Sequence, residues 1–242
     1  CQGPFDQPSS RARSPPESAK EQSLGGGGAW LGSTGLLRPP PPPPAMWVAE
    51  KPDVLMLGME SAGKSLLTRR MISLGKSGGG VEQLSASTVP TIGVEMQTVS
   101  QGKAALVIRE IGGNMLPVWP NYFADCSCLI YVIDASDASI LASSAMEMLE
   151  LLSAPALQGK PFLLVLNKQD LPCKLSRVEV EEVLRLRDLR EELPEGALTV
   201  METSGISGVG VQAVTEWILR QKDARAQKKP PGGGAAAGER WG

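Results

Sequence analysis

Short, almost continuously apolar runs alternate along this chain with longer segments whose apolar residues recur every three to four positions. The apolar runs predict strands at residues 54–57, 105–111, 129–134 and 162–167, with a more exposed strand at 94–100 and a short last one at 198–201. The amphipathic segments predict helices at residues 64–74, 138–152, 176–184 and 211–221. Such alternation predicts an α/β fold, with a mostly parallel six-stranded sheet flanked by helices.

Both ends of the chain lack this periodicity. Residues 1–47 are rich in Pro and Gly and cannot bury enough apolar surface to offset the entropy of ordering, so they are predicted to be a disordered tail. Met46 is the first methionine, and we expect residues 1–45 to be a translated upstream region and not part of the native protein. Residues 222–242 predict a second disordered tail, which leaves a folded domain at 48–221.

Composition narrows the classes of function. The net charge is −2, so no nucleic-acid partner is expected. We also expect the protein to be a monomer. Histidine is absent, which removes His-dependent triads and His zinc sites. Cys126 and Cys128 stand two positions apart in an apolar stretch, where a strand would point both to the same face, and we expect them to be reduced in a cytoplasmic protein.

A glycine-rich sequence between the first predicted strand and helix matches GxxxxGK[ST]. In such a loop, backbone N–H groups turn inward around phosphate oxygens at the positive end of a helix. Lys64 would place a cation on the outer phosphates, and Ser65 would offer a hydroxyl to Mg²⁺. The expected cofactor-binding residues of this loop are Gly58, Ser61, Ala62, Gly63, Lys64 and Ser65. The motif alone does not separate kinases, ATPases and GTPases.

An Asn-Lys-x-Asp sequence at the end of the 162–167 strand is suited to recognise the base of a bound nucleotide. The Asp170 carboxylate can accept hydrogen bonds from N1–H and the 2-amino group of guanine, whereas adenine would leave it unpaired. Asn167 would tie this loop to the phosphate loop, and the aliphatic stem of Lys168 would cover one face of the base. Ser204 and Gly205 follow the last strand and would let backbone N–H groups approach the guanine carbonyl. These features predict GTP or GDP as the ligand.

Three further segments complete a family pattern: Pro-Thr-Ile-Gly at 90–93, Glu-Ile-Gly-Gly at 110–113 and Pro-Val-Trp-Pro-Asn-Tyr-Phe at 117–123. With the two nucleotide motifs, they resemble the switch regions of small GTPases of the Ras superfamily, in particular the ADP-ribosylation factor (Arf) family. The strings at 109–113, 134–137 and 167–173 are similar to those of a divergent Arf-like branch. The resemblance covers about residues 52–219 and implies the P-loop NTPase fold in its small-GTPase (G-domain) form.

The resemblance also implies a mechanism. Thr91 would contact Mg²⁺ and the γ-phosphate, and the N–H of Gly113 would contact the γ-phosphate. Ser65 and Thr91 would ligate the Mg²⁺, with Glu110 reaching it through a water. Loss of the phosphate releases both switches, so that only the GTP form recruits effector proteins. An exchange factor and an activating protein are implied without being identified, and the family's roles imply a function in membrane or ciliary traffic.

Two departures from the family pattern concern hydrolysis. Glu110 stands where the family has Asp, and Asn114 stands where it has the water-positioning Gln. Asn114 joins Thr91 and Gly113 as a catalytic candidate, but its amide should fall about 1.5 Å short of the attacking water. We therefore expect slow or absent intrinsic hydrolysis. A GTP-locked interaction module without hydrolysis stays open as the alternative, and a P-loop kinase or transferase is disfavoured because no acceptor-binding lid is evident.

Other departures concern partners and membranes. Val94 and Arg109 occupy positions that are aromatic in Arf relatives, and of that trio only Tyr122 remains, so the effector set should differ. Neither Cys1 nor Met46 is followed by Gly, so no myristoylation signal or direct lipid anchor is expected. The expected location is cytoplasmic, with recruitment to membranes through partners.

Overall fold

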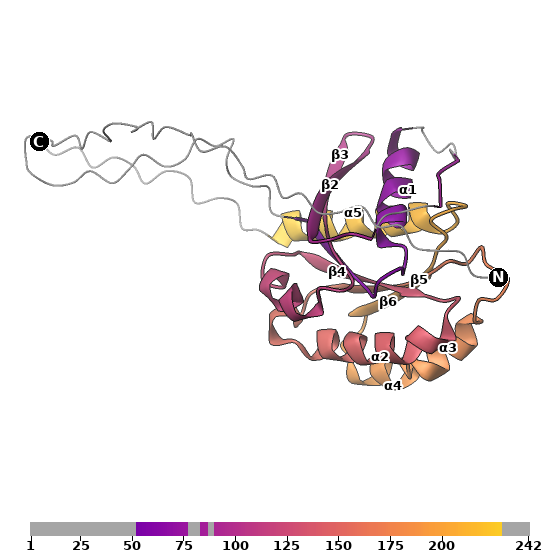
Figure 1. The fold of residues 1–242 in the computed structure, drawn as a ribbon. Coiled ribbons are helices and arrows are strands. Elements are labelled where there is room, and N and C mark those ends of the chain that lie inside the picture. The colour runs from indigo at the N-terminus through magenta and orange to yellow at the C-terminus, as the bar shows by residue number, and fades with distance from the viewer. Residues whose placement is uncertain (1–51, 77–82, 87–89, 229–242) are drawn as a thin grey trace, which may run out of the picture. The chain divides into compact units, whose positions relative to one another are not determined.

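A six-stranded sheet in the order β2-β3-β1-β4-β5-β6 forms the centre of the computed structural model, which describes residues 52–76, 83–86 and 90–228 (Figure 1). The strands are β1 (Val54–Leu57), β2 (Val94–Gln101), β3 (Ala104–Ile111), β4 (Cys128–Asp134), β5 (Phe162–Asn167) and β6 (Leu198–Glu202). Neighbouring strands are parallel except β2 and β3, which are antiparallel. The predicted α/β fold with a mostly parallel six-stranded sheet is confirmed.

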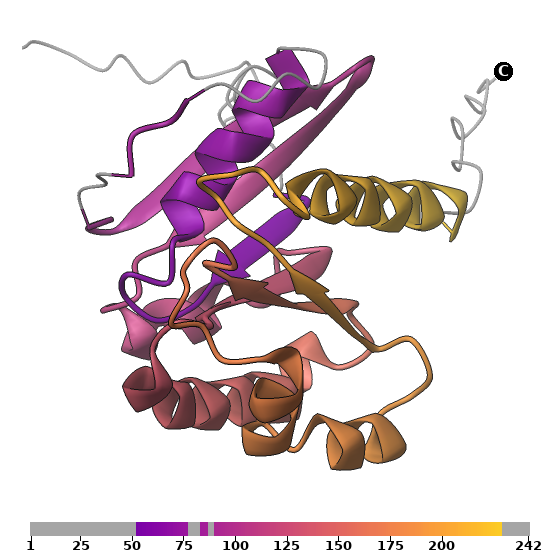
Figure 2. The same ribbon diagram turned by 90° about the vertical axis from the view of Figure 1, so that its right-hand side faces the viewer.

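Helices cover both faces of this sheet, as Figures 1 and 2 show. One face carries α1 (Lys64–Lys76) and α5 (Val211–Lys228), and the other carries α2 (Ala138–Ser153), α3 (Arg177–Val183) and α4 (Leu186–Glu192). Short 3-10 helices, η2 (Leu116–Tyr122) and η3 (Pro155–Leu157), lie in the connections. Because both faces are covered, every residue of β1, β4 and β5 is buried, which is why these strands are the apolar runs of the sequence.

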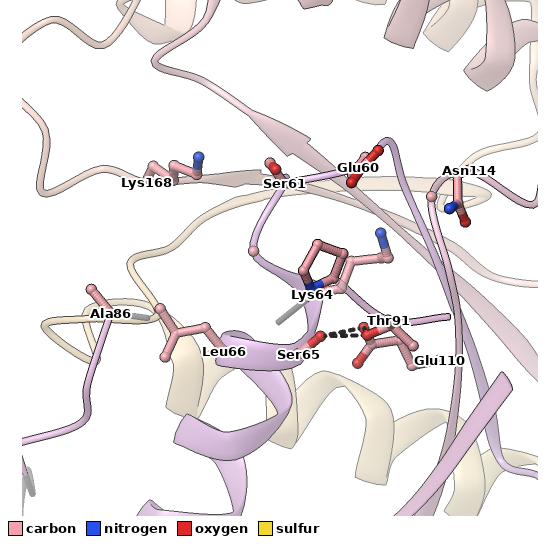
Figure 3. Close-up of a pocket in the computed structure, with 13 residues that line it drawn as sticks. Glu60, Ser61, Lys64, Ser65, Leu66, Ala86, Thr91, Glu110, Asn114 and Lys168 are labelled. Carbon is pink, nitrogen blue, oxygen red and sulfur yellow. Dashed lines mark hydrogen bonds between the residues drawn. The ribbon is translucent and has the colours of Figure 1, made fainter. Parts of the chain in front are cut away.

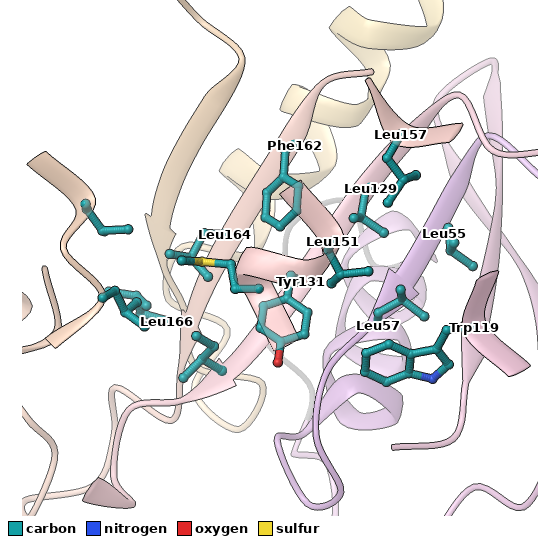
Figure 4. Packing of buried hydrophobic residues seen from close by; sticks show 14 of the residues in the cluster. Leu55, Leu57, Trp119, Leu129, Tyr131, Leu151, Leu157, Phe162, Leu164 and Leu166 are labelled. Carbon is teal, nitrogen blue, oxygen red and sulfur yellow. The ribbon is translucent and has the colours of Figure 1, made fainter. Parts of the chain in front are cut away.

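Alternate residues of the central strands enter two separate cores. Leu55 and Tyr131 belong to the core beneath α2, which Figure 4 shows, and Met56 and Ile130 belong to the core beneath α1 and α5. The Tyr131 hydroxyl is buried and donates to the backbone carbonyl of Ser144, 3.1 Å away. This satisfied hydroxyl lets an aromatic residue fill the core without an unpaired polar group.

The β2–β3 hairpin positions the switch segments. Gly102, with φ of 59°, begins its two-residue turn, and the register pairs Val94 with Ile111 and Glu95 with Glu110. The segment before β2 therefore lies beside the end of β3. This pairing brings Thr91 to Glu110, across 19 positions of sequence.

The domain boundary expected at residue 221 falls inside α5, which continues to Lys228. Lys222 donates through Nζ to Asp53 Oδ2 at 2.9 Å and to the Ala105 carbonyl at 2.6 Å, and Arg225 contacts the Ser127 hydroxyl. These contacts are polar, so hydrophobic periodicity did not indicate them, and the expected tail at 222–242 is wrong for residues 222–228. The remaining tail residues, 229–242, and the predicted tail at 1–47 lie outside the described residues.

The helix predicted at residues 176–184 is found as α3, and the charged stretch after it forms a further short helix, α4, that the pattern did not predict. The helices α3 and α4 are separated at Arg185, whose φ of 50° is left-handed and interrupts the helical path. Val180, Leu184 and Leu186 are buried against the α2 side of the sheet. Ion pairs such as that of Arg177 with Glu181 lie on the outside.

The expectation that Cys126 and Cys128 share a face is wrong. β4 begins only at Cys128, so strand alternation does not extend back to Cys126. Cys126 is buried in the core beneath α2, and Cys128 is buried in the core beneath α1 and α5. Both are free thiols, as predicted. Within the described ranges, no helix has the length and apolar character needed to span a bilayer.

Candidate functional site

The loop between β1 and α1 curls around the side chain of Lys64. Its Nζ donates to the backbone carbonyls of Gly58 at 2.8 Å and Met59 at 3.0 Å. Gly63 has φ of 89°, and a Cβ on it would stand 2.4 Å from the Nδ2 of Asn167. The left-handed φ and the close approach of the Asn167 amide together favour glycine at this point.

Three oxygen-bearing side chains from three segments meet beside this loop (Figure 3). The hydroxyls of Ser65 and Thr91 lie 3.0 Å apart, and both donate to Glu110 Oε1, at 2.6 Å and 3.1 Å respectively. Ser65 stands in the first turn of α1, Thr91 before β2 and Glu110 near the end of β3. The residues predicted to surround the cation are thus brought together.

The Glu110 carboxyl is buried, and its Oε2 has no hydrogen-bond partner among the described residues. Burial raises the pKa of Glu110 above its usual range, although the hydrogen bond from Ser65 and the charge of Lys64 oppose that rise. Burial likewise lowers the pKa of Lys64 to about 8, opposed by the carboxylates of Glu110 and Glu60. An unpartnered carboxylate oxygen beside two hydroxyls is a hard-oxygen donor set of the kind that fits Mg²⁺.

The second switch segment is held against both the phosphate loop and the first switch. A Cβ on Gly113 would stand 2.2 Å from the backbone N of Glu60, so this position packs directly on the phosphate loop. The N–H of Gly112 donates to the Gly93 carbonyl at 3.0 Å, and the buried indole of Trp119 donates to the Gly112 carbonyl at 3.3 Å. Movement of either switch segment would therefore break or shift contacts with the other.

A pocket of about 340 Å³ opens above these groups. Of the predicted site residues, its lining contains Ser61, Gly63, Lys64, Ser65, Thr91, Glu110, Gly113, Asn114 and Lys168. Asn114 is exposed, and Figure 3 shows it and Lys168 on opposite sides of Lys64. The predicted residues Gly58, Ala62, Asn167, Asp170, Ser204 and Gly205 are outside the lining.

Four lining residues were not predicted: Glu60, Leu66, Ala86 and Pro90. Glu60 lies inside the phosphate-loop motif, Leu66 directly follows it and Pro90 precedes Thr91, so proximity to the motifs was a usable signal for these three. Ala86 had no such signal, because it stands in a Gly/Ser-rich connector without chemical character.

Asn167 joins the phosphate loop to the loop after β6. Its Nδ2 donates to the Ala62 carbonyl at 2.9 Å, which is the predicted tie between the two loops. Its Oδ1 accepts from the Thr203 hydroxyl at 3.0 Å and from the Gly205 N–H at 3.3 Å. All four groups are buried, and both the nitrogen and the oxygen of this amide are hydrogen-bonded inside the protein.

Asp170 and Lys168 are both oriented by residues of other loops. Asp170 Oδ1 accepts from the Ser204 hydroxyl at 2.6 Å. Lys168, with φ of 65°, places its Nζ 2.5 Å from Asp134 Oδ2. Asp134 was not predicted as part of the site, although it pairs in register with Asn167 at the carboxyl ends of β4 and β5. Those strand ends are where ligands bind in parallel sheets.

The structure places Val94, Arg109 and Tyr122 differently with respect to solvent. Val94 is 38% exposed, whereas the Arg109 guanidinium lies 5.1 Å from the centre of the Tyr122 ring. Arg109 Nη1 is also 3.7 Å from Asp125 Oδ2. The one retained aromatic residue is thus partly covered by a cation.

Comparison with known proteins agrees with this geometry. Residues 46–222 match the family model described as the ADP-ribosylation factor family, and the chain belongs to this family of small GTPases, which bind GTP and GDP. It is 36% identical to ADP-ribosylation factor-like protein 16 of Homo sapiens over 166 residues, which are 68% of this chain and 83% of that protein. It is 31% identical to ADP-ribosylation factor-like protein 3 of Chlamydomonas reinhardtii over 170 residues, 69% and 89% of the two chains.

A solved structure supports the fold. The Arl6 BBS3 small GTPase from Trypanosoma brucei, with the bound nucleotide analogue GppNp, aligns with a TM-score of 0.58 at 21% identity. The alignment covers 73% of this chain and 98% of that one. The predicted family and the predicted small-GTPase fold are both confirmed.

Proposed function

We propose that this Arf-family chain is a Mg²⁺-dependent guanine-nucleotide switch whose GTP form recruits effector proteins. The observation that carries the proposal is the convergence of Ser65, Thr91 and Glu110 beside Lys64. Thr91 comes from the first switch, and it can reach the phosphate-loop hydroxyl only when that switch is closed. This is the conformation expected of a triphosphate-bound GTPase.

In this switch each residue has a distinct task. Lys64 neutralises the outer phosphates, Ser65 and Thr91 hold the cation, and Glu110 orients them through its Oε1. Gly113 offers its backbone N–H to the γ-phosphate, and both switches open when that phosphate leaves. On the base side, Asp170 reads guanine while Lys168 covers the ring.

Intrinsic hydrolysis is slow in this proposal because Asn114 lacks the reach of Gln. The short amide stands exposed at the pocket wall, with no hydrogen bond described that would aim it at an attacking water. This exposure favours, as a second candidate, a GTP-locked interaction module that does not hydrolyse. The two candidates share the nucleotide site and differ only in turnover.

The proposed partners are effectors that recognise the GTP form of the switch surface, together with an exchange factor and an activating protein. Ile92, Val94 and Met96 are exposed in and just before β2. Met96 pairs in register with Arg109, whose guanidinium lies over the Tyr122 ring. Apolar side chains beside a stacked cation suit a partner with mixed apolar and acidic character. By family analogy we place the protein in membrane or ciliary traffic, as a cytoplasmic monomer that partners recruit to membranes.

The nucleotide that co-purifies with the full chain tests the switch. The protein is denatured and the released nucleotide is separated by ion-exchange chromatography, with and without prior washing in EDTA. We expect a guanine nucleotide that is retained in Mg²⁺ and lost in EDTA. Absence of any guanine nucleotide, together with equal affinity for ATP and GTP, would overturn the proposal.

Hydrolysis is tested by single-turnover assays of the full chain and Asn114→Gln. We expect the variant to hydrolyse GTP about 10²-fold faster, since a misplacement of about 1 Å costs that much in an in-line attack. Asn121→Gln is the matched control, because Asn121 is exposed and outside the pocket. Equal rates for the wild type and Asn114→Gln would refute the argument about reach. No turnover in the wild type would select the GTP-locked candidate.

A further inference from the structure

Arg70 of α1 is completely buried, yet it belongs to none of the nucleotide motifs. Its Nε donates to the Gly205 carbonyl at 2.9 Å, and its Nη2 donates to the Ile206 carbonyl. Both acceptors stand in the loop after β6. Burying a guanidinium costs free energy unless its N–H groups are hydrogen-bonded. Because the guanidinium is a rigid planar fork, its two bonds attach α1 to the loop after β6 at two fixed points.

The attachment extends through the backbone to the base-reading carboxylate. A trans peptide directs its C=O and its N–H to opposite sides. Arg70 holds the Ile206 carbonyl, so it also sets the direction of the Ser207 N–H, which donates to Ser204 Oγ at 3.0 Å. Ser204 Oγ in turn donates to Asp170 Oδ1 at 2.6 Å. A continuous chain of contacts thus connects α1 to Asp170.

The surrounding packing keeps this chain in a single arrangement. Ser204 and Gly205 are buried, and a Cβ on Gly205 would approach Leu66 Cγ to 3.1 Å. The Ser204 N–H donates to the Val209 carbonyl at 2.9 Å, which closes the loop on itself. The loop is therefore fixed by Arg70 on one side and holds the Ser204 hydroxyl against Asp170 on the other.

We propose that Arg70 is a positioning residue for guanine selectivity, acting on Asp170 through the Ile206 peptide and the Ser204 hydroxyl. The proposal rests on the proposed role of Asp170 as reader of N1–H and the 2-amino group of guanine. It makes base recognition depend on the helix that also carries the phosphate loop. Arg70 itself does not touch the nucleotide.

The test compares two nucleotides on the full chain. Guanosine diphosphate and inosine diphosphate, both carrying a fluorescent ribose label, differ only by the 2-amino group that Asp170 would accept. Dissociation rates of both are measured for the wild type, for Arg70→Met and for Arg70→Lys, which keeps the charge but loses the fork. Arg69→Met is the matched control, since Arg69 is the exposed neighbour on the same helix.

We expect Arg70→Met to reduce the preference for guanosine over inosine diphosphate by about tenfold, as when a charged hydrogen bond is misaligned. Arg70→Lys should reduce it less, and Arg69→Met should leave it unchanged. A purely structural role would accelerate both dissociations equally and keep the ratio, and that result would overturn the inference. If Arg70→Met does not fold, the ratio measured for Arg70→Lys decides in the same way.

A further pair of variants separates this inference from the proposed function. Asp170→Asn should abolish the preference, and adding Arg70→Lys to it should cause no further loss. If the wild type shows no preference for guanosine over inosine diphosphate, the proposed role of Asp170 fails. If it shows the preference and both Arg70 variants retain it, only the role of Arg70 fails.

Discussion

Replacing Asn167 by Ala is expected to loosen the junction between the two nucleotide loops. The change removes three hydrogen bonds and leaves the buried polar groups of Ala62, Thr203 and Gly205 without this partner. At about 1 kcal/mol for each buried group left unpaired, the low end of the usual cost, the loss of unfolding free energy is at least about 3 kcal/mol. In a domain of this size that corresponds to a fall in melting temperature of about 6 to 12 °C.

Bound nucleotide must be separated from this intrinsic effect, because any ligand of the native state stabilises it by mass action. Thermal unfolding of the full chain is therefore followed at several GDP concentrations, and the melting temperatures are compared at equal saturation. Gln169→Ala is the matched control, since the Gln169 side chain has one described hydrogen bond, to the Leu166 carbonyl at 3.3 Å. A loss for Asn167→Ala no larger than that of the control would refute the reasoning.

Three further predictions follow from local geometry. In urea unfolding, Gly210→Ala should lower the free energy of unfolding well beyond Gly196→Ala. Both glycines have a left-handed φ, which costs another residue about 1 kcal/mol or more, but only at Gly210 would a Cβ also meet a carbonyl oxygen, that of Glu202, 2.0 Å away. Equal losses of unfolding free energy would contradict this. Because phosphate favours charged Lys64, whose pKa is about 8, GDP affinity measured calorimetrically should fall as the pH rises through that value, and a flat profile would be inconsistent. Lys222→Met should cost about 1 kcal/mol or less, since its contact with Asp53 is partly exposed, whereas ending the chain at residue 221 should cost more; an unchanged urea midpoint after truncation would argue against a packed α5 end.

In the switch segments, the sequence indicated which residues form the site but not how their side chains contact one another. The phosphate-loop motif identified Ser65, and the resemblance to the Arf family implied Thr91 and Glu110. That Glu110 Oε1 accepts from both hydroxyls at once depends on the β2–β3 register and on the length of the Glu side chain. Spacing along the chain does not contain that information.

Local sequence determined the strands and most of the helices of this protein, since burial on both faces requires continuous apolar runs and burial on one face requires periodic ones. It also determined the nucleotide motifs, because glycine conformation and side-chain chemistry act over a few residues. Outside these motifs, only the tertiary structure decided which distant groups meet. Arg70 and Ile206 are 136 positions apart, and Lys222 and Asp53 are 169 apart. These contacts are polar and do not recur along the chain, so they leave no periodic pattern in the sequence. Only the folded sheet and its covering helices bring these residues together.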